Sequence, residues 1–248
     1  TIFPFNVQFE ITKACPLRCS HCFNNSGEMR TNELSTREIK AVFDKLEAMG
    51  VKKIMITGGE PTIRKDFLEI VAYASGKFIG ISVASNGYCF TPEMAEKISK
   101  YKNVVVQISI DGTEEHHNLI RGMPDSFEKA TNAVKLLAKH GVRVIVASTF
   151  NNINYNDIDF VTALAKDLGA VQITYGVTFN IGRAKNNNLT DNLDVQSLMQ
   201  KSLEMRQKYS DHRFYVNAQD ISDEGLKKKA TTCGRGTSQI CIRENGDV

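Results

Sequence analysis

Short apolar segments alternate with amphipathic segments along most of the 248-residue chain, and this alternation restricts its fold more than any other feature. The apolar segments are rich in β-branched residues and end at glycine or polar residues, which is typical of buried strands. They occupy residues 7–11, 51–57, 79–85, 104–110, 143–149 and 171–177. Helical patterns occupy residues 35–49, 66–75, 92–100, 126–140, 155–168 and 193–209. Six strand–helix units predict an α/β fold with parallel strands, crossover helices and strands covered on both faces.

Three cysteines follow the first predicted strand in the pattern C-x3-C-x2-C: Cys15, Cys19 and Cys22. Iron–sulfur clusters are held by thiolates at short, fixed spacings, and three thiolates leave one iron of a four-iron cube open to a substrate or cofactor. A structural zinc site needs four ligands, and His21 is the nearby candidate for the fourth. Disulfides require paired cysteines and an oxidising compartment, which suits this motif poorly. The spacing favours the cluster and leaves the zinc site open.

The second predicted strand ends in Gly58, Gly59, Glu60 and Pro61. Glycines at a strand end have no Cβ, so the backbone there can come close to a ligand and bind a small charged group. An ordinary tight turn is the alternative for these four residues taken alone.

Polar residues also end the third and fourth predicted strands. Ser85 and Asn86 precede Gly87, a pattern that fits either a cofactor contact or an ordinary Asn-Gly turn. Ser109 alternates with apolar neighbours, so its hydroxyl points to one face of the sheet alone. Because the strands are parallel, we expect these residues at the same edge of the sheet as the cysteines.

The end of the chain carries a second cysteine pattern. Cys233 and Cys241 lie on glycine-rich backbone and suggest a second metal site, with a disulfide or two free thiols as alternatives. Asn245 followed by Gly246 predicts a hairpin turn. Since a chain is not expected to stop inside a hairpin, we expect the sequence to continue beyond Val248.

Charge and hydropathy exclude two classes of function. The 31 basic and 28 acidic residues give a net charge of +3 and are spread along the chain, which is not the pattern of a nucleic-acid-binding protein. No apolar stretch is long enough to span a bilayer, and no signal peptide is visible. Cysteine-rich motifs without a secretory signal predict a cytoplasmic protein in a reducing setting.

The two motifs together closely resemble those of the radical S-adenosylmethionine (SAM) superfamily. In that family the three cysteines hold a [4Fe–4S] cluster with one open iron, and Gly-Gly-Glu-Pro follows the second strand. The resemblance therefore implies SAM as cofactor and Cys15, Cys19 and Cys22 as cluster ligands. It also implies a partial (β/α)6 TIM-like barrel whose active site lies at the C-terminal ends of the strands.

The roles of further residues are implied by the same resemblance. Residues 109–122 resemble the S-x-D-G…H-x-x-x-R-G pattern of peptide- and protein-modifying members, in which the matching serine and arginine contact SAM. A surface ion pair with Glu114 or Glu115 is the alternative for Arg121. His21 stands where the family has an aromatic residue near the adenine. The expected cofactor-binding residues are His21, Gly58, Gly59, Glu60, Pro61, Ser85, Asn86, Ser109 and Arg121, and no catalytic acid or base is identified.

The last part of the chain resembles the start of a SPASM or twitch domain, a cysteine-rich extension that holds auxiliary clusters. The implied division is a radical SAM core at residues 1–185, followed by a linker helix and a truncated SPASM/twitch start at residues 186–248. Cys233 and Cys241 would then be two ligands of an auxiliary iron–sulfur cluster.

The resemblance implies reductive cleavage of SAM to a 5′-deoxyadenosyl radical, which takes a hydrogen atom from a precursor peptide to install a thioether or carbon–carbon cross-link. A one-electron reductant such as flavodoxin or ferredoxin is the implied partner. Two alternatives remain: oxidation of a small molecule or a sulfatase active-site residue, and a non-enzymatic iron–sulfur or zinc protein.

Overall fold

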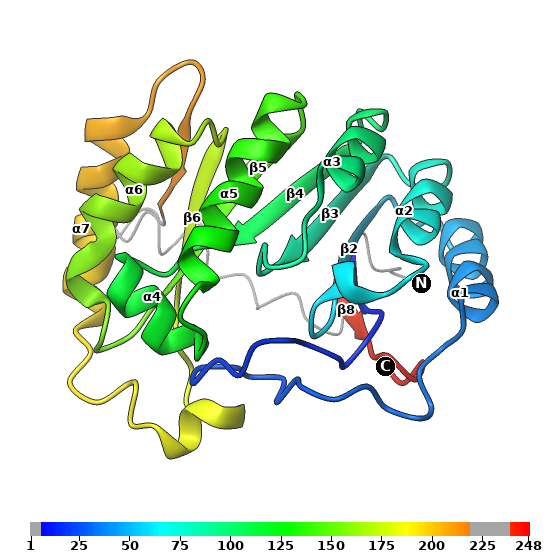
Figure 1. Ribbon diagram of the computed structural model, residues 1–248, viewed down its shortest axis with the longest axis horizontal. Helices are drawn as coiled ribbons and strands as arrows, with labels where there is room; N and C mark the ends of the chain where they lie inside the picture. The colour runs from blue at the N-terminus through cyan, green and yellow to red at the C-terminus, as the bar shows by residue number, and fades with distance from the viewer. Residues whose placement is uncertain (1–5, 219–238) are drawn as a thin grey trace.

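The computed structural model describes residues 6–218 and 239–248, which form one sheet of eight parallel strands (Figure 1). The strand order is β7-β6-β5-β4-β3-β2-β1-β8, so β1 to β6 neighbour one another in chain order. The bounds are β1 Asn6–Glu10, β2 Lys53–Thr57, β3 Gly80–Ser85, β4 Val104–Ser109, β5 Arg143–Phe150, β6 Gln172–Val177, β7 Tyr215–Asn217 and β8 Gln239–Ile242. The predicted α/β class and all six predicted strands are confirmed.

Helices connect the strands and pack on their neighbours in chain order, from α1 at one end of the sheet to α6 and α7 at the other (Figure 1). Their bounds are α1 Thr36–Ala48, α2 Phe67–Ser75, α3 Pro92–Ser99, α4 Glu114–Arg121, α5 Ser126–Lys139, α6 Ile158–Asp167 and α7 Val195–Tyr209. Three short 3-10 turns are η1 Pro61–Ile63, η2 Tyr155–Asp157 and η3 Gly182–Asn186. Ser35 and Glu38 form a capping box at the start of α1, in which the Ser35 amide donates to Glu38 Oε2 at 2.8 Å.

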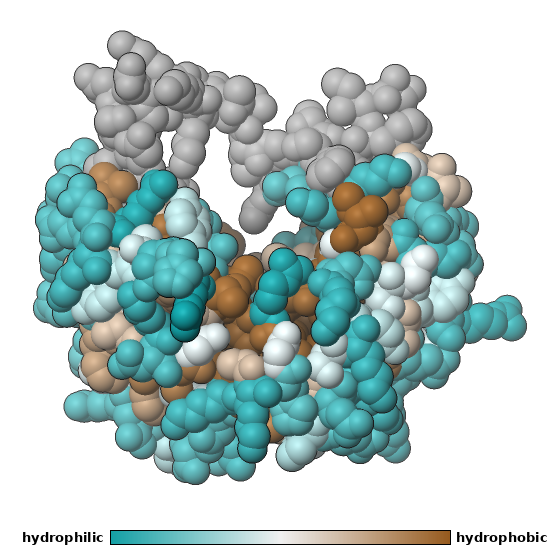
Figure 2. Space-filling view, turned by 90° about the horizontal axis from the view of Figure 1, so that it is seen from above, coloured by the Kyte–Doolittle hydropathy of each residue, from teal (hydrophilic) through white to brown (hydrophobic). Residues whose placement is uncertain are grey.

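The hydrophobic core lies between the sheet and the helices. Alternate strand residues such as Phe9, Ile56 and Val83 are fully buried there, and Phe9 packs edge-to-face on Phe43 of α1 with ring centroids 5.8 Å apart. The residues between them face a hollow of about 1560 Å³ that the inner face of the sheet lines. Figure 2 shows the molecule hollowed at its centre, with apolar residues exposed in the depression.

The expectation that both strand faces are covered holds only in part. Inward-facing residues such as Met55 and Val105 are partly exposed in the hollow, whereas their outward-facing neighbours are buried. The sequence does not separate the two cases, because both faces carry apolar residues.

One α-helix and two strands were not predicted. Helix α4 lies between the fourth strand and the next predicted helix, and β7 and β8 extend the two edges of the sheet. The predicted turn after β8 is confirmed, since the Gly246 amide donates to Arg243 O at 2.9 Å. The strand before it pairs in parallel with β1. The division at residue 185 stays a prediction.

None of the described helices combines the length and the hydrophobicity needed to cross a bilayer.

Candidate metal and cofactor site

The three clustered cysteines lie in the loop that follows β1, and none of them is in a disulfide. Cys15 and Cys19 are buried, whereas Cys22 is partly exposed. Burial raises the pKa of the Cys15 thiol to about 12, and the nearby charges of Cys19 and Glu60 contribute; burial also raises the pKa of Cys19. Thiols in such surroundings become thiolates when a metal cation binds them. The loop therefore has the donor chemistry of a metal site.

The two metal sites that the cysteine spacing allows need different arrangements of the thiols. Among residues 6–218 and 239–248, no three His, Cys, Asp or Glu side chains are gathered closely enough to hold one metal ion. A tetrahedral zinc site needs its ligands around one point, with sulfur at about 2.3 Å from the ion. A four-iron cube takes each thiolate at a separate corner. The C-x3-C-x2-C spacing remains the observation that favours the cluster.

Arg183, which follows β6, holds the cysteine loop from the opposite end of the sheet. Its Nε donates to Cys19 O and its Nη1 to Ser26 O, both at 2.8 Å, and its backbone amide donates to Cys22 O at 3.0 Å. The preceding Gly182 has a φ of +58°, and a Cβ there would lie 2.4 Å from Cys22 O. This segment is part of the scaffold of the cysteine loop.

The two glycines after β2 pack against the backbone of the cysteine loop. The Gly59 amide donates to Thr12 O at 2.7 Å, and the Glu60 amide donates to Ala14 O at 2.8 Å. A Cβ on Gly58 would lie 2.3 Å from Thr12 O, and one on Gly59 would lie 2.2 Å from Ala14 O. The close approach that we expected toward a ligand is therefore an approach between two loops of the chain itself. Contact of these four residues with a ligand stays a prediction.

Glu60 links the ends of β2 and β3. Its fully buried carboxylate accepts hydrogen bonds from Ser85 Oγ and the Asn86 amide, both at 2.7 Å, and from Thr62 Oγ1 at 2.6 Å. Burial raises the pKa of this carboxyl against the effect of these donors. Asn86 in turn places Nδ2 3.6 Å from Cys15 Sγ. The side chains of Glu60 and Ser85 are thus hydrogen-bonded to each other, and Asn86 is the residue of this group that contacts a thiol.

Arg121, at the end of α4, forms a buried ion pair that the sequence did not reveal. Its Nη2 lies 2.6 Å from Oδ2 of Asp111, which is fully buried, and its Nη1 lies 3.9 Å from Cys19 Sγ. Burial opposes the charge on Asp111, but the guanidinium outweighs it and holds the pKa of that carboxyl below its usual range. The predicted alternative, a surface ion pair with Glu114 or Glu115, is wrong.

His21 lies beside this ion pair. Its Nε2 is 3.7 Å from Asp111 Oδ2, and burial lowers the pKa of the imidazole to about 4, so the ring is neutral at pH 7. Two buried nitrogens of the group, His21 Nδ1 and Arg121 Nε, have no hydrogen-bond partner. Buried polar atoms without a partner are rare in folded proteins and are common where a ligand completes the site.

The remaining expected residues lie as follows. Pro61 is buried at the start of η1, and Ser109 is the partly exposed last residue of β4. Cys241 lies on β8, with Sγ 4.0 Å from Glu10 Oε1. Cys233 falls outside the described residues. The structure thus gathers the N-terminal cysteines, Glu60, Asn86 and Arg121, and places Cys241 on the neighbouring strand β8.

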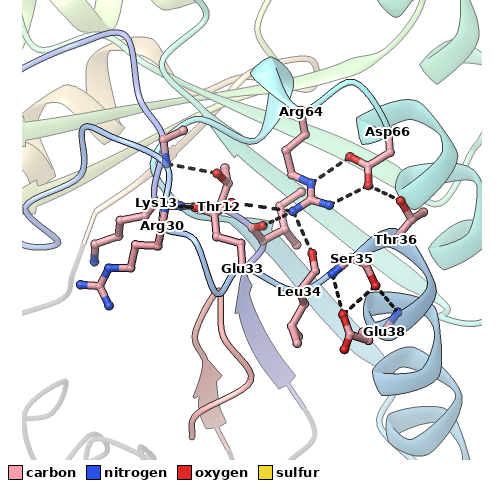
Figure 3. Close-up of polar contacts among 12 residues, drawn as sticks. Thr12, Lys13, Arg30, Glu33, Leu34, Ser35, Thr36, Glu38, Arg64 and Asp66 are labelled. Carbon is pink, nitrogen blue, oxygen red and sulfur yellow. Dashed lines mark hydrogen bonds and ion pairs between the residues drawn. The ribbon is translucent and has the colours of Figure 1, made fainter.

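Figure 3 shows a polar network behind the cysteine loop that the sequence analysis missed. Arg64 donates to the carbonyl oxygens of Ile11, at 2.8 Å, and Leu34, at 3.2 Å. It also makes a two-point contact with Asp66, at 2.8 and 2.6 Å. This guanidinium fixes the end of the first strand, from which the cysteine loop departs.

The residues present fit an iron–sulfur cluster with a small ligand beside it. N–H donors near two of the thiols, on Asn86 and Arg121, are the outer contacts that stabilise metal-bound sulfur. The partner-free Nε of Arg121 supplies a donor for a polar group of a ligand, and the partner-free Nδ1 of the neutral His21 ring donates or accepts according to its tautomer.

Comparisons with known proteins agree with this site. Residues 9–165 match the family model described as the radical SAM superfamily. The chain is 35% identical over 246 residues to the sporulation killing factor maturation protein SkfB of Bacillus subtilis, covering 99% of this chain and 59% of SkfB. It is 30% identical over 243 residues to the AdoMet-dependent heme synthase of Methanosarcina barkeri, covering 93% of this chain and 69% of that protein.

Solved structures share the fold. The crystal structure of Streptococcus suis SuiB bound to the precursor peptide SuiA superimposes with a TM-score of 0.82 at 15% identity, over 99% of this chain and 58% of SuiB. The partial-barrel architecture is thus confirmed. The chain spans about three fifths of the lengths of SkfB and SuiB. On its motifs, its fold and the matched family model, the chain belongs to the radical SAM superfamily.

Proposed function

We propose that this chain is the catalytic core of a radical SAM enzyme that installs a thioether or carbon–carbon cross-link in a peptide. Membership of the family implies a [4Fe–4S] cluster and SAM. One observation carries the proposal: Arg121, whose buried Nε has no hydrogen-bond partner, places its Nη1 3.9 Å from Cys19 Sγ, and the buried Nδ1 of His21, within the cysteine loop, has no partner either. A structural metal site would need no such donors.

In this proposal Cys15, Cys19 and Cys22 bind three irons and leave the fourth to SAM. The cluster and SAM, when bound, supply reductive cleavage of the sulfonium and then removal of a hydrogen atom from the substrate. The protein's part is to hold the three thiolates and to exclude water from them. The burial of Cys15 and Cys19 and the packing of the Arg183 segment over the loop support that role.

The proposed contacts to SAM use the polar groups of the site that are not engaged in hydrogen bonds within the protein. Arg121 uses Nε to bind the carboxylate of SAM, since its Nη2 is committed to Asp111. The amides of Gly59 and Glu60 donate to the cysteine loop, so the carbonyl oxygens between Gly58 and Pro61 bind the amino group. Ser109 and His21 complete the site, with His21 near the adenine. Glu60 and Ser85 position these groups rather than touch SAM.

Further parts of the proposal concern the whole protein. We propose a cytoplasmic enzyme, reduced by a flavodoxin or ferredoxin, with the SAM site in residues 1–185 and a SPASM or twitch extension beginning within residues 186–248. Cys233 and Cys241 would be ligands of an auxiliary cluster there. Cys241 is exposed on β8, the strand at the edge of the described sheet, and lines the hollow.

A peptide is favoured as the substrate because SkfB is a maturation protein and SuiB has been solved with a precursor peptide. The hollow of about 1560 Å³ beside the site is also larger than most small-molecule pockets. A second candidate is a small molecule, favoured by the likeness to a heme synthase.

The test is anaerobic reconstitution with iron and sulfide, followed by reduction with dithionite in the presence of SAM. We expect release of 5′-deoxyadenosine, and its loss in Cys19→Ala. Cys89→Ala is the matched control, because Cys89 is also a thiol without a disulfide but lies outside the three-cysteine loop. Cleavage of SAM that survives in Cys19→Ala, or zinc in place of iron by elemental analysis, would contradict the proposal.

The substrate is tested with synthetic peptides from the short open reading frames beside the gene. A mass loss of two hydrogens in one peptide supports the cross-linking function. Turnover of a porphyrin and of no peptide would favour the second candidate.

A further inference from the structure

Glu10 is the last residue of β1 and the one acidic side chain among the described residues that line the hollow. Its side chain lies on the inner face of the sheet, in register with Thr57 of β2. The same face continues across the sheet through Ala84 and Gln107. Glu10 therefore lies at the C-terminal edge of the strands, where the cysteine loop begins.

The carboxylate of Glu10 is buried and incompletely bonded. The residue is 3% exposed, and Oε1 lies 4.0 Å from Cys241 Sγ. Oε2 is buried and has no hydrogen-bond partner. The ammonium of the neighbouring Lys13 donates to Asn24 Oδ1 and lies beyond ion-pair distance of the Glu10 carboxylate.

Other buried carboxylates of the described chain are matched by cations or donors. Asp111 pairs with Arg121, Glu244 pairs with Arg30 at 3.0 Å, and Glu60 accepts several hydrogen bonds. Glu10 alone among these lines the hollow and has no cation within ion-pair distance. An uncompensated buried carboxylate is costly, so a ligand that supplies a donor at this point is favoured.

We propose that Glu10 is a substrate-binding residue whose Oε2 accepts an N–H donor of the peptide laid along the hollow. This rests on the function proposed above and adds the contact that fixes the peptide beside the cofactor site. The hollow extends from Lys13 near the cysteine loop to Lys53 and Arg143 at the N-terminal ends of their strands. β1 has five residues and therefore spans roughly 17 Å along the hollow. An extended peptide segment of about five residues has the same length.

The donor is either a backbone amide or a cationic side chain of the peptide, since both present N–H groups. A charge-assisted hydrogen bond to a cation responds to loss of the carboxylate charge, whereas a backbone amide is also accepted by a neutral carbonyl oxygen. Glu10→Gln therefore separates the two sources, and Glu10→Ala removes both.

The experiment uses the reconstituted holoenzyme and the peptide in which mass spectrometry detects the modification. We expect the KM for that peptide to rise about tenfold or more in Glu10→Ala, with iron content and SAM affinity as in the wild type. In Glu10→Gln the rise is as large if the donor is a cation and smaller if it is an amide. Replacing the lysines and arginines of the peptide by norleucine gives the same loss only in the first case. Glu47→Gln, on the exposed surface of α1, is the control and leaves the KM unchanged.

An unchanged KM in a folded Glu10→Ala enzyme overturns the inference and leaves the proposed function standing. If the wild type modifies no peptide, the proposed function fails separately. Glu10 is then tested with N-acetyl-argininamide and N-acetyl-norleucinamide by saturation-transfer NMR. Binding of the argininamide that depends on Glu10 supports the carboxylate as a donor-binding site, and equal signals with wild type and Glu10→Ala overturn it.

Discussion

The ion pair between Asp111 and Arg121 gives the sharpest prediction about stability. Asp111 is fully buried, Arg121 is 7% exposed, and the charged atoms lie 2.6 Å apart. Asp111→Asn keeps a side-chain oxygen for the Thr149 amide, which now donates to Oδ1 at 2.9 Å. It leaves the guanidinium buried without a counter-charge, and removal of one partner of such a pair costs about 3–5 kcal/mol.

The assay is urea denaturation of the metal-free protein, in which Asp111→Asn is expected to lower the free energy of unfolding by about that amount. Glu93→Gln removes one partner of an exposed pair with Lys97 and serves as the control, with no measurable change expected. The double variant Asp111→Leu with Arg121→Met leaves no unpaired charge, so it should unfold at a higher urea concentration than Asp111→Asn. A loss below about 1 kcal/mol in Asp111→Asn, or a double variant that is less stable than the single one, would refute the reasoning.

Three further predictions concern the scaffold of the site. Gly59→Ala places a Cβ 2.2 Å from Ala14 O and should lower the iron content of the reconstituted protein, whereas Gly76→Ala, whose Cβ meets nothing closer than 3.7 Å, should not; equal iron contents would contradict the packing. Arg183→Gln removes the contacts to Cys19 O and Ser26 O and should speed the loss of iron to a chelator, with Lys185→Gln as control; equal release rates would show that the contacts do not hold the loop. Burial lowers the pKa of His117 from 6.5 to about 3. Between these pH values His117 is protonated in the unfolded chain but not in the folded protein, so the free energy of unfolding falls as the pH drops from about 6.5 toward 3. His117→Gln should remove up to about 5 kcal/mol of that pH dependence, as measured by urea denaturation at several pH values, and an unchanged slope would disprove the burial of the neutral ring.

The arrangement of strands was predictable because each strand carries its own local signal. The six apolar runs and their bounding residues predicted β1 to β6 within a few residues. The edge strands β7 and β8 are three and four residues long, too short for a period-two pattern to stand out. Helix α4 did carry a signal that went unused: Thr113 caps its start, and Gly122, with a φ of +70°, ends it.

The site was predictable in its position but not in its internal contacts. The cysteine and Gly-Gly-Glu-Pro motifs indicated which strand ends matter, yet the role of Glu60 depends on Ser85 and Asn86 of the next strand. Asp111 is the aspartate of the S-x-D-G pattern, but no residue pattern around it indicated that Arg121 would turn inward and pair with it. Contacts between segments far apart in sequence leave no periodic signal, so they emerge only from the folded structure.

The contact between Arg183 and the cysteine loop has a consequence for the order of assembly in the cell. The two partners of its Nε–Cys19 bond are separated by 164 positions. A ribosome has therefore made most of this chain before the loop acquires its final shape. We therefore expect iron loading to follow synthesis of the sixth strand, and nascent chains stalled before that point to be poor acceptors for the machinery that delivers clusters.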